Sequence, residues 1–132
     1  PPRPAVPAAP YPPHGVPGVP LTPRGSRYGE APDYLERCDD EIAILVQIET
    51  MSALDRVAEI AAVDGVTGVF FGPADLSADM GHLGKPGHPD VTAAIERGCK
   101  AVRDAGKPAG ILLGGAAQSV PWLKTGMRFV AW

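Results

Sequence analysis

The sequence has few cysteines, no long apolar run and no excess of basic charge, and each absence excludes a class of protein. Its 132 residues hold two cysteines, Cys38 and Cys99, without CxxC spacing. This excludes a disulfide framework and favours a reduced, cytoplasmic protein. No segment reaches the ~18–20 apolar residues of a membrane-spanning helix, so we expect no membrane partner. Twelve basic against fifteen acidic residues give a net charge of −3, so we expect no nucleic-acid partner.

Proline is abundant but unevenly distributed. Eleven of the 16 prolines lie in residues 1–32, where each fixes φ and removes a backbone donor. A regular helix or a central strand is therefore excluded there. Composition favours a disordered or loosely draped arm, and a polyproline ligand for an SH3-like groove is the alternative. We predict two parts: residues 1–32, an irregular proline-rich arm, and residues 33–132, the folded domain.

Beyond the arm, apolar residues alternate between strand-like runs and helix-like spacing. Four short apolar runs are typical of buried strands: 42–49, 66–71, 109–113 and 127–132. Helical spacing or capping signals predict three helices: 52–62, a helix opened by His88-Pro89 and closed by Gly106, and a short one ending near Lys124. The second helix has an apolar stripe of Val91, Ala94, Ile95, Cys99 and Val102. Residues 72–87, polar and rich in glycine, are predicted to form a loop.

Strand and helix follow each other with short links, which predicts an α/β fold of parallel β/α units with helices covering a sheet. Such crossovers are right-handed. A closed (β/α)₈ barrel needs ~250 residues, so this sequence can supply about half of one. An open doubly wound sheet is the alternative.

Two acids, Glu49 and Asp75, follow predicted strands at the end where parallel α/β folds gather their reactive groups. Glu49 closes an apolar run, where a carboxylate is costly unless it is compensated. A divalent cation held by both carboxylates is one compensation, and oxygen ligands favour Mg²⁺ or Mn²⁺. The alternatives are a lysine or backbone partner for Glu49 and a helix N-cap role for Asp75.

The segment Gly72-Pro73-Ala74-Asp75 marks a sharp turn, after which the amides of Ala74 and Asp75 can face a small anion such as a carboxylate. Asp79 is expected to be a solvated loop residue. The three histidines are not expected to be catalytic: His14 in the arm, His82 in the loop, and His88 as a helix cap. The lysines are expected to be surface charges: Lys85, Lys100, Lys107 and Lys124.

The most specific pattern is the pair LVQIET at residues 45–50 and GVFFGPADLSADMG at residues 68–81. At this spacing the pair resembles the HpcH/HpaI aldolase family, class II metal-dependent pyruvate aldolases built on a (β/α)₈ TIM barrel. The likeness covers roughly residues 32–132 and continues through HPDV at residues 88–91 and GIL at residues 110–112. It implies that this chain is the second half of such a barrel, with its last four strands.

The resemblance implies reversible cleavage of 4-hydroxy-2-oxo acids to pyruvate and an aldehyde, a carbon–carbon lyase reaction. Matched residue by residue, Glu49 and Asp75 become the ligands of a divalent metal, Mg²⁺ or Mn²⁺, with Co²⁺ also suitable. The implied substrate-binding residues lie at the strand ends and in the loop: Gln47, Gly72, Pro73, Ala74, Asp75 and Leu112.

The family's base histidine and keto-acid-binding arginine belong to the first half of the barrel, so the resemblance assigns no catalytic residue to this chain. Because full-length relatives assemble as oligomers, a homo-oligomer is expected. The leading hypothesis is a truncated metal-dependent aldolase. The alternatives are an inactive fragment that binds a divalent metal or a small oxo acid, and a self-associating structural remnant.

Overall fold

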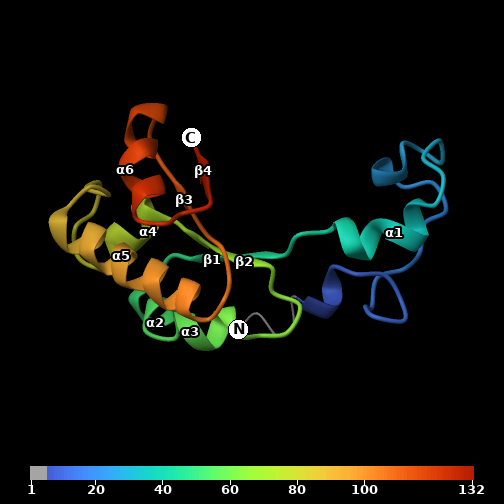
Figure 1. The fold of residues 1–132 in the computed structure, drawn as a ribbon, viewed down its shortest axis with the longest axis horizontal. Coiled ribbons are helices and arrows are strands. Elements are labelled where there is room, and N and C mark those ends of the chain that lie inside the picture. The colour runs from blue at the N-terminus through green and yellow to red at the C-terminus, as the bar shows by residue number, and fades with distance from the viewer. Residues whose placement is uncertain (1–5) are drawn as a thin grey trace. The chain divides into compact units, whose positions relative to one another are not determined.

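The computed structural model describes residues 6–132, which divide into two compact units, one ending at Ile44 and the other comprising Leu45–Trp132 (Figure 1). In the first unit, the 3₁₀ helices η1 (Val6–Ala8) and η2 (Arg24–Ser26) precede α1 (Tyr34–Glu41). The buried Ser26 hydroxyl donates to the Pro23 carbonyl at 2.8 Å and accepts from the Gly29 N–H at 2.9 Å. As the prolines predict, the described part of residues 1–32 has no regular α-helix or strand.

The second unit is built on a four-stranded parallel sheet with the order β1-β2-β3-β4. Its strands are β1 (Leu45–Ile48), β2 (Gly68–Phe71), β3 (Ala109–Leu112) and β4 (Phe129–Ala131). Each lies inside a predicted strand but is shorter than it. The parallel α/β architecture predicted from the alternation is therefore confirmed.

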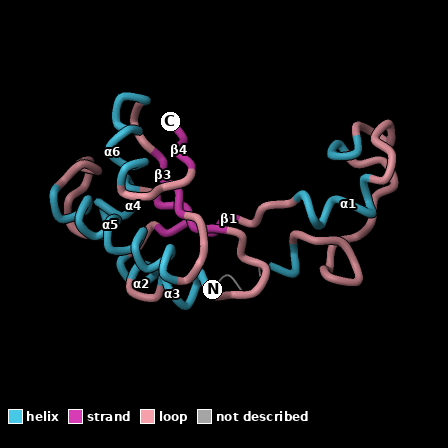
Figure 2. The backbone as a smooth tube through the Cα atoms, viewed as in Figure 1, coloured by secondary structure: helices cyan, strands magenta, loops and turns pink. Residues whose placement is uncertain are grey.

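Helices follow the strands and cover one face of the sheet (Figures 1 and 2). They are α2 (Met51–Leu54), α3 (Val57–Ala61), α4 (Pro73–Asp79), α5 (Pro89–Asp104) and α6 (Ser119–Lys124), the last preceded by the 3₁₀ helix η3 (Ala116–Gln118). The helix predicted at 52–62 is split in two, because Arg56 leaves the helical region with φ −109° and ψ 15°. No helix in the described residues is long and apolar enough to cross a membrane.

The prediction of a loop at residues 72–87 was wrong for the first half of this segment, which forms helix α4. Pro73 occupies the first helical position, where its missing N–H has no intrahelical role. Leu76 and Ser77 are fully buried, so this side of the helix packs against the core. The N-cap is Gly72, so the alternative that made Asp75 the cap was also wrong. Asp75 lies in the first turn, where a negative charge is favourable.

The core lies between the sheet and the helices. Alternate strand residues, among them Val69, Phe71 and Ile111, are fully buried against it. The whole predicted stripe of α5 is buried there as well. Gly98 lets α5 approach the sheet closely, since a Cβ at that position would lie 2.9 Å from the Phe71 ring.

The opposite face of the sheet carries no helix of this unit (Figure 2). We call it the open face; its residues are Leu45, Gln47, Phe70, Leu112 and Phe129. The Phe70 and Phe129 rings stack with centroids 5.5 Å apart. The Phe129 ring passes over Gly110, where a Cβ would lie 2.2 Å from it. In a closed (β/α)₈ barrel, the helix-free face of the strands forms the interior.

Candidate metal and substrate site

Glu49 directly follows β1 at the carboxyl end of the sheet. It is half-buried, and it is the only one of the fifteen acidic residues, all within the described part of the chain, that is not exposed. Its carboxylate makes no hydrogen bond or ion pair with another described residue. A half-buried carboxylate without a partner is costly, so both oxygens of Glu49 are available to a cation.

The end of β2 lies against Glu49. A Cβ at Gly72 would be 3.0 Å from Glu49 Cγ and 3.3 Å from both Glu49 Oε1 and Gln47 Nε2. The Gly72 N–H donates to the Ile48 carbonyl at 3.0 Å. The structure therefore brings Gln47, Glu49 and Gly72 together, as expected from their places at the strand ends.

Asp75 lies three residues beyond Gly72, in the first turn of α4. Its side chain is exposed and has no hydrogen bond or ion pair with another described residue. Pro73 is buried and Ala74 is exposed at the start of the same helix. Two carboxylates that have no partner among the described residues thus belong to neighbouring strand–helix junctions at the carboxyl end of the sheet.

A contact that the sequence did not suggest joins these two junctions. Asp79, the last residue of α4, accepts a hydrogen bond from the Met51 N–H at 2.7 Å. Although exposed, Asp79 is therefore not the solvated loop residue that we expected. The sequence carries no signal for this pair, because the two residues are 28 positions apart.

Leu112, at the end of β3, lies with Pro73 in the wall of a cavity of about 400 Å³. Trp122 and Pro121 contribute further apolar surface, while Glu96 is a charged member of the wall. Gln47, Glu49, Ala74 and Asp75 are not part of this wall. The predicted substrate residues therefore fall into two groups, one around Glu49 and one around the cavity.

The remaining predictions concern histidines and lysines. His88 is the N-cap of α5, as predicted, and its Nδ1 accepts from the Asp90 N–H at 3.2 Å. Lys107 is partly buried and donates to the Val66 carbonyl at 2.7 Å, so its prediction as a surface charge was wrong. The other three lysines are exposed. Both cysteines are free and buried.

Comparison with known proteins identifies the relatives of this chain. The family model described as HpcH/HpaI aldolase/citrate lyase matches residues 6–132. Two curated relatives, from Shigella sonnei and Klebsiella pneumoniae, are each named 4-hydroxy-2-oxo-heptane-1,7-dioate aldolase. They are 49% and 51% identical over 108 residues, 82% of this chain and 41% of each relative. The chain thus spans less than half the length of these relatives.

A solved structure matches most of the fold, including its first unit. It is an HpcH/HpaI aldolase/citrate lyase family protein from Burkholderia cenocepacia, with a TM-score of 0.85 and 37% sequence identity. The match covers 96% of this chain and 51% of that protein. The four parallel strands and their connecting helices correspond to part of a TIM-barrel-like fold.

Proposed function

The chain belongs to the HpcH/HpaI aldolase/citrate lyase family, and from this premise we propose that it contributes the metal-binding half of an aldolase. The proposed reaction is the reversible cleavage of a 4-hydroxy-2-oxo acid to pyruvate and an aldehyde. The names of the curated relatives, 4-hydroxy-2-oxo-heptane-1,7-dioate aldolase, support this substrate class. A cytoplasmic location, where both thiols remain reduced, is part of the proposal.

The observation that carries the proposal is the environment of Glu49. Within residues 6–132, Glu49 is the one acidic residue that is not exposed. Its carboxylate has no partner among the described residues, and it lies against the β2–α4 junction that leads to Asp75. Two carboxylates fit a hard divalent cation, Mg²⁺ or Mn²⁺, with Co²⁺ also suitable. When bound, such a cation supplies positive charge to the substrate oxygen on which negative charge develops during bond cleavage.

The chain's own residues would then bind and orient the keto acid. We propose that the side-chain amide of Gln47 lies beside the keto acid, because this amide and the Glu49 side chain both lie close to Gly72. The backbone amides of Ala74 and Asp75, in the first turn of α4, would hold the carboxylate of the keto acid. Leu112 and Pro73 would contact the aldehyde portion from the cavity that they line.

We assign no proton-transfer residue within this chain. The family resemblance places the base histidine and the keto-acid-binding arginine in the first half of the barrel. The proposal therefore assigns metal and keto-acid binding, and no proton transfer, to the residues of this chain.

This proposal is tested by measuring Mn²⁺ affinity with and without pyruvate, with lactate as the matched control that lacks the 2-oxo group. Pyruvate should tighten Mn²⁺ binding and lactate should not. Equal affinity under all three conditions would contradict the keto-acid site. Because the proposal gives this chain no proton-transfer residue, the chain alone should release little pyruvate from a 4-hydroxy-2-oxo acid. Rapid metal-dependent pyruvate release would contradict that part of the proposal.

A second candidate function, self-association, rests on the open face. Leu45 and Leu112 are 46% and 44% exposed. In the described residues β1 pairs only with β2, and β4 only with β3. Sheet edges and exposed apolar faces are both sites of association. As an alternative to the keto-acid site, which uses Gln47 and Leu112 of the same face, we propose that a homo-oligomer forms through this face.

A further inference from the structure

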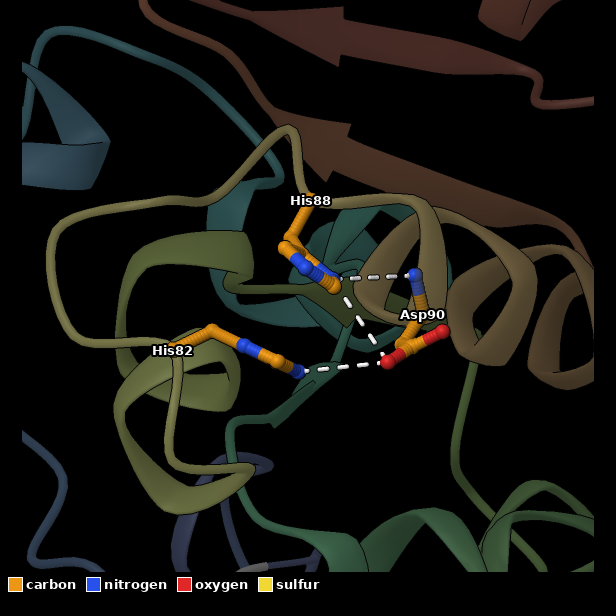
Figure 3. A group of neighbouring side chains, drawn as sticks. All are labelled: His82, His88 and Asp90. Atoms are coloured by element: carbon orange, nitrogen blue, oxygen red, sulfur yellow. Dashed lines mark hydrogen bonds and ion pairs between the residues drawn. The ribbon is translucent and has the colours of Figure 1, made fainter.

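Three side chains with metal-binding groups lie together between α4 and α5, apart from the Glu49 site (Figure 3). His82 lies in the turn after α4, His88 is the N-cap of α5, and Asp90 is the second residue of α5. One ligand atom from each residue lies within 4.8 Å of the other two. Nothing in the proposed aldolase reaction uses this cluster.

The distances suit a tetrahedral metal. His82 Nε2 lies 3.3 Å from Asp90 Oδ2, and His88 Nδ1 lies 3.6 Å from the same oxygen. Two ligands bound at ~2.0–2.1 Å with a tetrahedral angle between them are about 3.3 Å apart. The three groups can therefore reach one ion by small side-chain rotations.

The hydrogen bond at His88 also shows which of its ring nitrogens can act as a metal ligand. His88 Nδ1 accepts a hydrogen bond from the Asp90 N–H, so it presents a lone pair, not a proton, beside the carboxylate. The His82 and His88 rings stack with centroids 3.6 Å apart and planes 14° apart. A cation among these groups offsets the repulsion between the lone pair and the carboxylate, in exchange for the capping hydrogen bond.

The backbone holds the two histidines in place. The His82 N–H donates to the Ser77 carbonyl at 2.7 Å, the Lys85 N–H to the His82 carbonyl at 2.9 Å, and the His88 N–H to the Lys85 carbonyl at 3.0 Å. The side chains are 26% exposed for His82, 31% for His88 and 68% for Asp90. A metal ion can therefore enter from solvent and keep water as its fourth ligand.

We propose that His82, His88 and Asp90 bind a divalent transition metal of the Zn²⁺ class. Two imidazoles select such an ion over Mg²⁺, which prefers oxygen ligands. The site would join the end of α4 to the start of α5. The turn that it fixes continues into Pro86 and Gly87, which line the cavity shared with Leu112.

The full chain is suited to a direct test, because it has three histidines. Their imidazole NMR signals are followed while Zn²⁺ is added, with Mg²⁺ in a parallel titration. Zn²⁺ should shift the His82 and His88 signals and leave His14 unchanged, although His14 also faces a carboxylate, that of Asp39. Mg²⁺ should leave all three unchanged.

Variants separate this site from the carboxylate pair. His82→Ala and His88→Asn should each weaken Zn²⁺ binding at least tenfold; Asn retains an N-cap acceptor at position 88. His14→Ala should leave Zn²⁺ affinity unchanged, and His82→Ala should leave the pyruvate-dependent Mn²⁺ binding of the Glu49 site unchanged. Unaltered affinity in both His82→Ala and His88→Asn, equal shifts at all three histidines, or no shift with excess Zn²⁺ would each overturn the proposal.

Discussion

The carboxylate of Asp79 accepts a hydrogen bond from the backbone N–H of Met51 at 2.7 Å. Met51 is the first residue of α2 and follows Glu49 by two positions; Asp79 ends α4, one turn after Asp75. This hydrogen bond therefore connects the segment that follows Glu49 to the helix that carries Asp75. Asp79 is on this account a positioning residue for the metal site.

Replacing Asp79 should therefore weaken metal binding without removing a ligand. Asp79→Ala deletes a charge-assisted hydrogen bond at an exposed position, worth about 1 kcal/mol, and Mn²⁺ affinity should fall about fivefold. Asp79→Asn keeps an acceptor for the Met51 N–H and should recover most of the affinity. If both variants lose affinity equally, the charge and not the hydrogen bond is what matters.

Gly72 should be sensitive to the addition of a single carbon. The Cβ of Gly72→Ala would lie 3.0 Å from Glu49 Cγ and 3.3 Å from Gln47 Nε2, so both side chains must move. A displacement of this kind costs on the order of 1 kcal/mol, and Mn²⁺ and pyruvate should both bind several-fold more weakly. Gly114→Ala is the control, since its Cβ would meet nothing within 4 Å. Equal affinities in the two variants would show that Glu49 is not held against Gly72.

Burial raises the pKa of the Cys99 thiol, and the Arg103 charge and a hydrogen bond with the Thr125 side chain offset this only in part. In alkaline solution the unfolded chain loses this proton while the folded chain retains it. The contribution of Cys99 to stability is therefore complete below the ordinary thiol pKa and is lost as pH rises toward the raised pKa. Urea unfolding at pH 7.5 and 9.5 should show a smaller pH dependence for Cys99→Ala than for the parent chain. An identical dependence would contradict this assignment.

Self-association should depend on the open face. Leu45 is 46% exposed there, and burial of a leucine stabilises by about 1.5–3 kcal/mol. Leu45→Lys should therefore weaken association at least tenfold in sedimentation equilibrium. Leu123→Lys is the matched control, because Leu123 is 48% exposed on α6, in the helical layer. Equal weakening by both substitutions would place the interface elsewhere.

Periodicity predicted the elements that bury most apolar surface. The four strands lie within the apolar runs. Helix α5 was predicted with its buried stripe because the apolar spacing of a 16-residue amphipathic helix is a strong signal. Helix α4 was missed because only a few of its seven residues are buried and Pro73, Asp75 and Ser77 resemble loop composition. Helix α1, with Cys38 as its only buried residue, was missed for the same reason.

The site was predictable to the same extent. Glu49 could be predicted as a site residue because a carboxylate at the end of an apolar strand is unusual and costly unless it is compensated. The Asp79–Met51 hydrogen bond, the Lys107–Val66 contact and the stacking of His82 on His88 could not be predicted. Each depends on how two elements pack or how a turn folds, and no local pattern encodes such a pairing.

Titration of Mn²⁺ into the parent chain, Glu49→Ala and Asp75→Ala decides whether Glu49 and Asp75 hold a divalent cation. Asp55→Asn serves as the control, since Asp55 is exposed and has no side-chain partner among the described residues. If they do, Mn²⁺ should bind saturably to the parent chain and to Asp55→Asn, and binding should be lost in both alanine variants. Unchanged Mn²⁺ affinity in Glu49→Ala and Asp75→Ala would contradict the proposed metal site.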